Sequence, residues 1–131
     1  MGAAARNRLS LPTSQIWKSG AFTTAQTGTA LWTPTAGKKI AITSIQLGTS
    51  GSTSAKLTLW FGAAGDTAYT AGTDQLVFAG TLAPILISGV EPVLLIAPTL
   101  APIIAATADD ILRITTDANL TVDVAVYGYE F

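Results

Sequence analysis

The sequence predicts an all-β protein, a β-sandwich or barrel of about eight short antiparallel strands. Three observations support this prediction. From residue 15 onward Thr, Val, Ile and aromatic residues recur, and Gly, Ser, Asp and Pro interrupt them at short intervals. No stretch repeats its apolar residues with the period of an amphipathic helix. The 131 residues are 49% hydrophobic and 11% charged, so the chain can bury a sizeable core.

The chain divides into a short arm and one folded domain. Residues 1–14 contain small residues, Arg6, Arg8 and Pro12, and they show no periodicity. Two interpretations stay open: a frayed terminus, or an extended arm that becomes ordered on a partner. Residues 15–131 form the predicted β-sandwich domain.

Turn-forming residues separate the expected strands. Residues 48–54 predict a loop between hairpin partners, residues 62–72 a longer loop, and Asp117-Ala118-Asn119 a tight turn. Residues 101–108 could form one helical turn, which Pro102 disfavours. Strands are expected over 15–24, 29–33, 39–47, 56–62, 75–79, 93–97, 110–116 and 120–131.

The clearest strands, 56–62 and 120–131, alternate strictly between two faces. One face of each is apolar, and these residues are Leu57, Leu59, Phe61, Leu120, Val122, Val124 and Val126. The opposite faces carry Lys56, Thr58 and Trp60 in the first strand, and Thr121, Asp123, Ala125, Tyr127, Tyr129 and Phe131 in the second. We expect the second strand to end docked in a sheet.

The segment 39–47 changes face in its middle. Ile40 and Ile42 lie on one side, and Ile45 and Leu47 on the other. This switch predicts either a β-bulge or a strand that is buried on both sides.

Composition excludes several functions. The chain has no His and no Cys, which removes imidazole bases, thiol nucleophiles and the usual transition-metal ligands. A net charge of -1 argues against nucleic-acid binding. Prolines and Glu91 interrupt the longest apolar region, 82–106, so we expect no transmembrane segment, and the N-terminus lacks the apolar stretch of a secretory signal. No cofactor is expected.

Carboxylates are the remaining catalytic candidates, namely Asp66, Asp74, Glu91, Asp109, Asp110, Asp117, Asp123 and Glu130. Neighbouring residues of a strand point to opposite faces, so Asp109 and Asp110 cannot easily flank one bond. Asp66 and Asp74 flank a Gly-containing loop and could hold calcium, but the spacing of an EF-hand is absent. The sequence therefore predicts a protein that is not an enzyme.

The apolar content exceeds what one small sandwich can bury. Only 15 residues are charged, and the outward strand faces offer Thr, Ala, Ser, Tyr and Trp. Such surfaces are typical of obligate oligomers, so we expect much of this surface to meet another protein. The aromatic residues could instead form a platform for sugar rings or pack in the core and at interfaces; they are Trp17, Trp32, Trp60, Tyr69, Tyr127 and Tyr129.

Two stretches carry a resemblance to a known class of proteins. They are KKIAITSIQLG (38–48), followed after a loop by AKLTLWFG (55–62), and the ending DILRITTDANLTVDVAVYGYEF (110–131). Together they resemble small jelly-roll-like β-sandwich proteins that decorate and cement the capsids of tailed bacteriophages. The resemblance covers residues 38–131 and lies in the strand pattern and the closing aromatic tail.

The resemblance implies a structural protein, often trimeric, that binds the outer surface of an assembled capsid and clamps neighbouring coat subunits. The partners would be the major capsid protein and further copies of this chain, and the location would be the virion. Polarity and position suggest the contact residues: Arg6, Arg8, Leu9, Leu11, Trp17, Trp32, Leu82, Ile85, Leu86, Ile87, Leu100, Ile103 and Ile104. The head domain of a tail fibre or spike, which binds a receptor or glycan, has the same texture and is the alternative.

Overall fold

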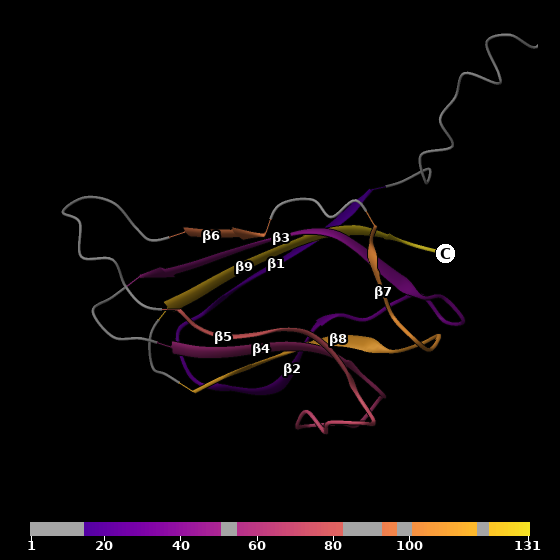
Figure 1. The fold of residues 1–131 in the computed structure, drawn as a ribbon, viewed down its shortest axis with the longest axis horizontal. Helices are drawn as coiled ribbons and strands as arrows, with labels where there is room; N and C mark the ends of the chain where they lie inside the picture. Colours follow the sequence, from indigo (N-terminus) through magenta and orange to yellow (C-terminus); the bar gives the residue numbers. More distant parts are fainter. Residues whose placement is uncertain (1–14, 51–54, 83–92, 97–100, 118–120) are drawn as a thin grey trace, which may run out of the picture.

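The computed structural model describes residues 15–50, 55–82, 93–96, 101–117 and 121–131, which contain strands and no helix. Within these ranges, accordingly, no helix is long and apolar enough to cross a membrane. The strands are β1 (Ile16–Phe22), β2 (Gln26–Trp32), β3 (Ile40–Ser50), β4 (Ala55–Gly62), β5 (Gln75–Leu82), β6 (Val93–Ile96), β7 (Ile103–Ile104), β8 (Ile111–Thr116) and β9 (Thr121–Glu130). They form two layers (Figure 1).

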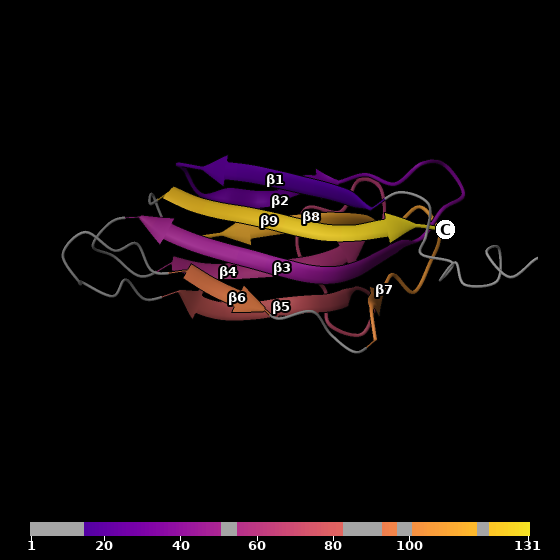
Figure 2. The same ribbon diagram turned by 90° about the horizontal axis from the view of Figure 1, so that it is seen from above.

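The strand order identifies the fold. Sheet A runs β1-β9-β3-β6, with the two-residue β7 also beside β3, and sheet B runs β2-β8-β4-β5. Figure 2 shows the strands of sheet A side by side over those of sheet B. The pairs β4–β5, β3–β6, β2–β8 and β1–β9 enclose one another along the chain, and all are antiparallel. This nested pairing over two sheets is a jelly roll, so the predicted fold class is confirmed.

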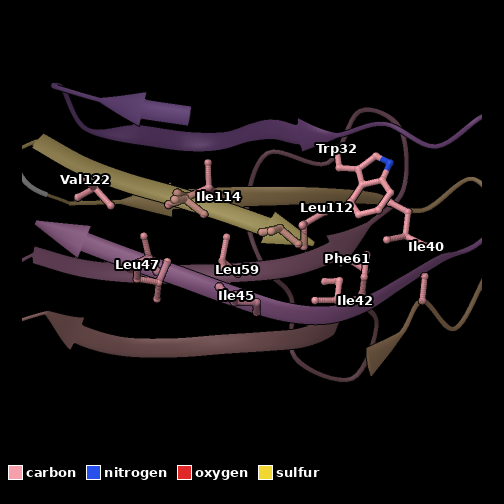
Figure 3. Close-up of a cluster of buried hydrophobic side chains, with 14 residues drawn as sticks. Trp32, Ile40, Ile42, Ile45, Leu47, Leu59, Phe61, Leu112, Ile114 and Val122 are labelled. Carbon is pink, nitrogen blue, oxygen red and sulfur yellow. The ribbon is translucent and has the colours of Figure 1, made fainter. Parts of the chain in front are cut away.

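The core lies between the two sheets (Figure 3). Most of its members are aliphatic and aromatic side chains from β3, β4, β8 and β9, and its largest is Trp32 of β2; each has at most 2% of its surface exposed. Val122, Val124 and Val126 of β9 point inward as their alternation predicted. Leu57, Leu59 and Phe61 of β4 meet them from sheet B, and Lys56 is exposed on the other face.

A bulge in β3 explains the change of face in the sequence. The register between β3 and β9 shifts between Ile42 and Ser44, so β3 contains one extra residue and its side chains exchange faces at this point. Ile40, Ile42, Ile45 and Leu47 therefore all reach the core. The bulge, one of the two alternatives predicted, is the correct one.

Gly128 makes room for this bulge. A Cβ atom at Gly128 would collide with the carbonyl oxygen of Ala41 in β3. The hydroxyl of Thr43 donates a hydrogen bond of 3.1 Å to the carbonyl of Tyr127 on the neighbouring strand. The absence of a side chain at Gly128 thus lets the backbones of β3 and β9 approach closely where the register changes.

The end of β9 is docked in the sandwich, as expected. The backbones of Phe131 and Lys39 exchange two hydrogen bonds of 3.0 and 3.1 Å. Glu130 accepts one hydrogen bond from the indole nitrogen of Trp32 at 2.9 Å and one from the backbone nitrogen of Thr35 at 3.1 Å. These contacts tie the end of sheet A to sheet B.

Some expected boundaries differ from the structure. β2 begins at Gln26, three residues before the predicted strand, and β3 continues to Ser50 into the predicted loop. The segment 101–108 contains the short strand β7 and no helical turn. The expected arm, residues 1–14, lies outside the described residues, as does the turn at 118–119.

Candidate interaction surface

The outer face of sheet A carries a strip of aromatic side chains. Trp17 of β1 pairs directly with Tyr127 of β9, and their rings stack with centroids 6.4 Å apart and an angle of 21° between planes. Tyr129 of β9 and Phe131, the residue after this strand, follow on the same face, with ring centroids 6.0 Å apart. Trp17 is 61% exposed and Phe131 51% exposed, so the strip presents ring surface to solvent. We call these four residues the aromatic strip.

The strip widens across β3 toward β7. Ala41 of β3 pairs with Tyr129 on one side and with Ile104 on the other, so the three side chains share a face. Ala41 is fully buried on this outer face, whereas Ile104 is 41% exposed. The apolar surface therefore continues beyond β9 to the edge formed by β7.

A shallow groove adjoins the strip on the same face. It has a volume of about 320 Å³ and runs across β1, β9 and β3. It forms because the outward residues here are small, which leaves space that larger side chains would fill. Its lining includes Ser19, Ala21, Gln46, Gly48, Asp123 and Ala125.

The outer face of sheet A is nearly free of charge. At the described outward positions of β1, β3 and β9, the charged side chain is that of Asp123. Lys18 of β1 stands opposite the inward-facing Val126, on the other side of the strand. Exposed apolar surface of this kind is typical of an interaction site.

The outer face of sheet B differs because the loop 63–74 folds back over it. Trp60 points outward from β4, yet it is fully buried beneath this loop, with Tyr69 packed edge-on at 6.3 Å. A Cβ atom at Gly28 of β2 would lie 2.6 Å from the carbonyl oxygen of Thr67, so the loop backbone rests on β2. The loop thereby removes Trp60 from any surface platform.

Arg113 of β8 holds this loop in place. Its guanidinium is buried and donates hydrogen bonds to the carbonyl oxygens of Gly28 at 2.8 Å and Ala63 at 3.0 Å. It also lies over the ring of Trp60, 5.9 Å from the centroid. The indole N–H of Trp60 and the Nε–H of Arg113 find no hydrogen-bond partner among the described residues. Arg113 therefore links β2, β8 and the loop across sheet B.

The loop aspartates cap turns. A carboxylate oxygen of Asp66 accepts a hydrogen bond from the backbone nitrogen of Ala63, and one of Asp74 accepts from that of Thr70, each at 2.7 Å. Such contacts are typical of Asp in turns. Among the described residues no three His, Cys, Asp or Glu side chains form a group that could hold a metal ion.

The aspartates next to β8 also bond to backbone. Asp109, at a positive φ of 68°, accepts a hydrogen bond from the backbone nitrogen of Gly37 at 2.6 Å. Asp117 accepts one from that of Lys56 at 2.7 Å. Burial raises the pKa of Asp110; a hydrogen bond from the backbone of Thr107 acts against this rise, and Asp74 and Asp66 add to it.

The structure separates the predicted contact residues into distinct groups. Trp17 and Ile104 are exposed on sheet A, and Ile103 is half-buried against the core. Leu82 is the last residue of β5. Arg6, Arg8, Leu9, Leu11, Ile85, Leu86, Ile87 and Leu100 lie outside the described residues.

Trp32 requires a correction. It was predicted as a contact residue, but it is 1% exposed and belongs to the core. It points inward at the end of β2, where Glu130 of the opposite sheet accepts its indole N–H. The residues around Trp32 in the sequence do not indicate whether its ring faces the core or solvent.

The predicted capsid contacts omit Tyr127, Tyr129 and Phe131, although Tyr127 and Tyr129 are among the aromatic residues of the possible sugar platform. Their signal was present in the alternation of β9, which placed all three on the face opposite the valines. The sequence did not show which residue lies beside these rings, because Trp17 is far away in the sequence and becomes adjacent to Tyr127 only through the β1–β9 pairing.

Comparison of the chain with protein-family models, with curated protein sequences and with solved structures finds no match.

Proposed function

We propose that this chain is a structural protein of a bacteriophage virion, which docks on the outer surface of the assembled capsid and stabilises it by bridging neighbouring coat subunits. The observation that carries the proposal is the nearly uncharged outer face of sheet A with its aromatic strip. Trp and Tyr are the residues most often responsible for binding energy at protein interfaces. The resemblance of residues 38–131 to decoration proteins supplies the identity of the partner.

The jelly-roll topology is compatible with this role. Jelly rolls are frequent among viral capsid and lectin domains. A rigid sandwich presents a flat sheet face without reorganisation, which lowers the entropic cost of docking. A protein that binds only the assembled lattice stabilises that lattice by mass action.

Binding to capsids tests the proposal directly. Heads would be prepared from the phage that encodes the chain, with its gene deleted, and mixed with purified protein. We expect the protein to co-sediment with these heads and to raise their melting temperature. The double variant Trp17→Ala/Tyr127→Ala should bind at least about tenfold more weakly, because it removes the stacked pair of the aromatic strip.

Tyr69→Ala is the matched control, since Tyr69 is an aromatic residue of the sheet B side. It should bind heads like the wild-type protein. Equal binding by all three proteins, or no binding by the wild type, would contradict the proposal.

A second candidate function is glycan binding by the head domain of a tail fibre or spike. The exposed ring of Trp17, nearly parallel to that of the half-buried Tyr127, favours it, because sugar rings stack on aromatic faces as other apolar groups do. This function predicts retention on immobilised host lipopolysaccharide that the double variant loses, together with no binding to heads.

A further inference from the structure

The edge strands of the described part of the sandwich are protected to different degrees against pairing with another chain. They are β1, β6 and the two-residue β7 in sheet A, and β2 and β5 in sheet B. An edge strand exposes backbone N–H and C=O groups that can recruit a further strand. Proteins protect such edges with charges, prolines, bulges, short strands or covering loops.

The edges other than β5 carry a recognisable protection. β1 has Lys18 on its core-facing side, beside the edge. β2 pairs with β8 through two register shifts, and the loop 63–74 rests on its Gly28. β6 has four residues and β7 has two, so each offers few hydrogen bonds to an additional strand.

β5 lacks most of these protections. Its eight residues, QLVFAGTL, include no charged residue and no proline. One register shift with β4 lies between Leu59 and Trp60, and beyond it Phe78–Leu82 pair with β4 without interruption. Within the described part of the chain no strand pairs with the outer edge of β5. Leu76 is 44% exposed, and the side chains of Ala79 and Thr81 are exposed as well.

The end of β5 near Gln75 is already occupied. The side-chain amide of Gln75 donates to the carbonyl of Ile104 at 2.9 Å and accepts from the backbone nitrogen of Ala106 at 2.8 Å. This amide ties β5 to the segment of β7 in the other sheet. As far as the described residues go, the part of the edge open to a partner is therefore the regular run 78–82, whose centre is Gly80.

We infer that β5 pairs antiparallel with β5 of a second copy, around a two-fold axis near Gly80, and joins the two B sheets into one. Because β5 has no charged residue, it cannot select a partner by opposite charge. A second copy of the chain needs no such selection, since an isologous contact uses the same strand from both subunits. With the axis at Gly80, Ala79 faces Thr81 of the partner subunit, and the two Ala79 side chains are diagonal neighbours. This contact is independent of the proposed docking of sheet A.

The test measures the mass of the purified full chain by light scattering over a series of micromolar concentrations. We expect a dimer that dissociates on dilution. Ala79→Lys should raise its dissociation constant by at least about tenfold, because like charges then meet across the axis. Mixing Ala79→Lys with Ala79→Glu should restore the dimer. Circular dichroism and thermal melting of each variant verify that the fold is intact.

Ala30→Lys is the matched control, because Ala30 is an exposed alanine on β2, the opposite edge of the same sheet. It should dimerise like the wild type. A monomer at every concentration, a trimer, or an oligomer that survives Ala79→Lys would each overturn the inference. Head binding by Ala79→Lys is expected to persist, so failure of this inference is distinguishable from failure of the proposed function.

Discussion

At the scale of single residues, Glu130 shows how one carboxylate can join two sheets. Burial by itself raises the pKa of Glu130, but hydrogen bonds from the Trp32 indole and from Thr35 outweigh it, and Lys18 contributes in the same direction. The net pKa therefore lies below the ordinary value. The same contact satisfies the indole N–H of a tryptophan whose ring is in the core.

Glu130→Gln should lower the free energy of unfolding by about 1–2 kcal/mol at neutral pH, because the amide cannot accept both hydrogen bonds as well as the carboxylate does. A lowered folded-state pKa stabilises the protein above the unfolded-state pKa, and this contribution disappears as the pH falls through the folded-state pKa. The difference between wild type and variant should thus shrink below about pH 4. Urea unfolding at several pH values measures it.

Asp123→Asn is the control for this experiment, since Asp123 lies exposed in the groove. It should change stability by less than about 0.5 kcal/mol. A difference for Glu130→Gln that stays constant down to strongly acid pH would contradict the role assigned to this carboxylate.

At the scale of elements, the loop 63–74 determines what sheet B exposes. The loop has no strand pairing of its own beyond one isolated bridge between Ala71 and Asp74, so its position depends on side-chain contacts. Arg113 supplies the central one, with two hydrogen bonds from a buried cation to carbonyl oxygens. Hydrogen bonds to charged groups are among the stronger ones in proteins.

Arg113→Met should release this loop and expose Trp60. We expect a loss of at least about 2 kcal/mol in unfolding free energy, because two carbonyls lose a charged donor. Amide hydrogen exchange in residues 63–74 should accelerate more than in β3 and β9, and the fluorescence of Trp60 should shift to the red. Lys56→Met, an exposed change on the same outer face, serves as the control and should alter neither measurement.

At the scale of the whole molecule, the two sheets present different surfaces. Sheet A offers an aromatic and nearly uncharged face, whereas sheet B is partly covered by its own loop and ends at β5, a strand without charge or proline. The expectation that the chain associates with other proteins remains a prediction, and so does the trimer implied by the resemblance. A soluble, folded monomer at high concentration that also binds no head would contradict association altogether.

Salt distinguishes the two ways in which the protein could hold a capsid. Docking through sheet A buries apolar surface and one charge, so sodium chloride should change its affinity by less than about threefold, and sulfate should strengthen it. Contacts of Arg6 and Arg8 with coat carboxylates would instead weaken steadily as salt is added. Head-binding titrations at increasing sodium chloride measure the difference, and a variant lacking residues 2–14 separates the arm from the face.

The sequence by itself determined the fold class and much of the core. Successive side chains of a strand alternate between its two faces, so the core-facing residues can be recognised from a short stretch of sequence. The valines of β9 and the leucines of β4 could be assigned to the core from that alternation alone. The bulge in β3 was visible as a change of face between Ile42 and Ile45.

Only the tertiary structure decided which outward residues stay exposed. Trp17 and Tyr127 become neighbours through pairing of the first and last strands, and Trp60 is hidden by a loop that crosses three strands. Both outcomes depend on the lateral order of strands, which the two-residue period does not encode. The candidate interaction surface therefore could not be located from local pattern, since its residues are far apart in the sequence.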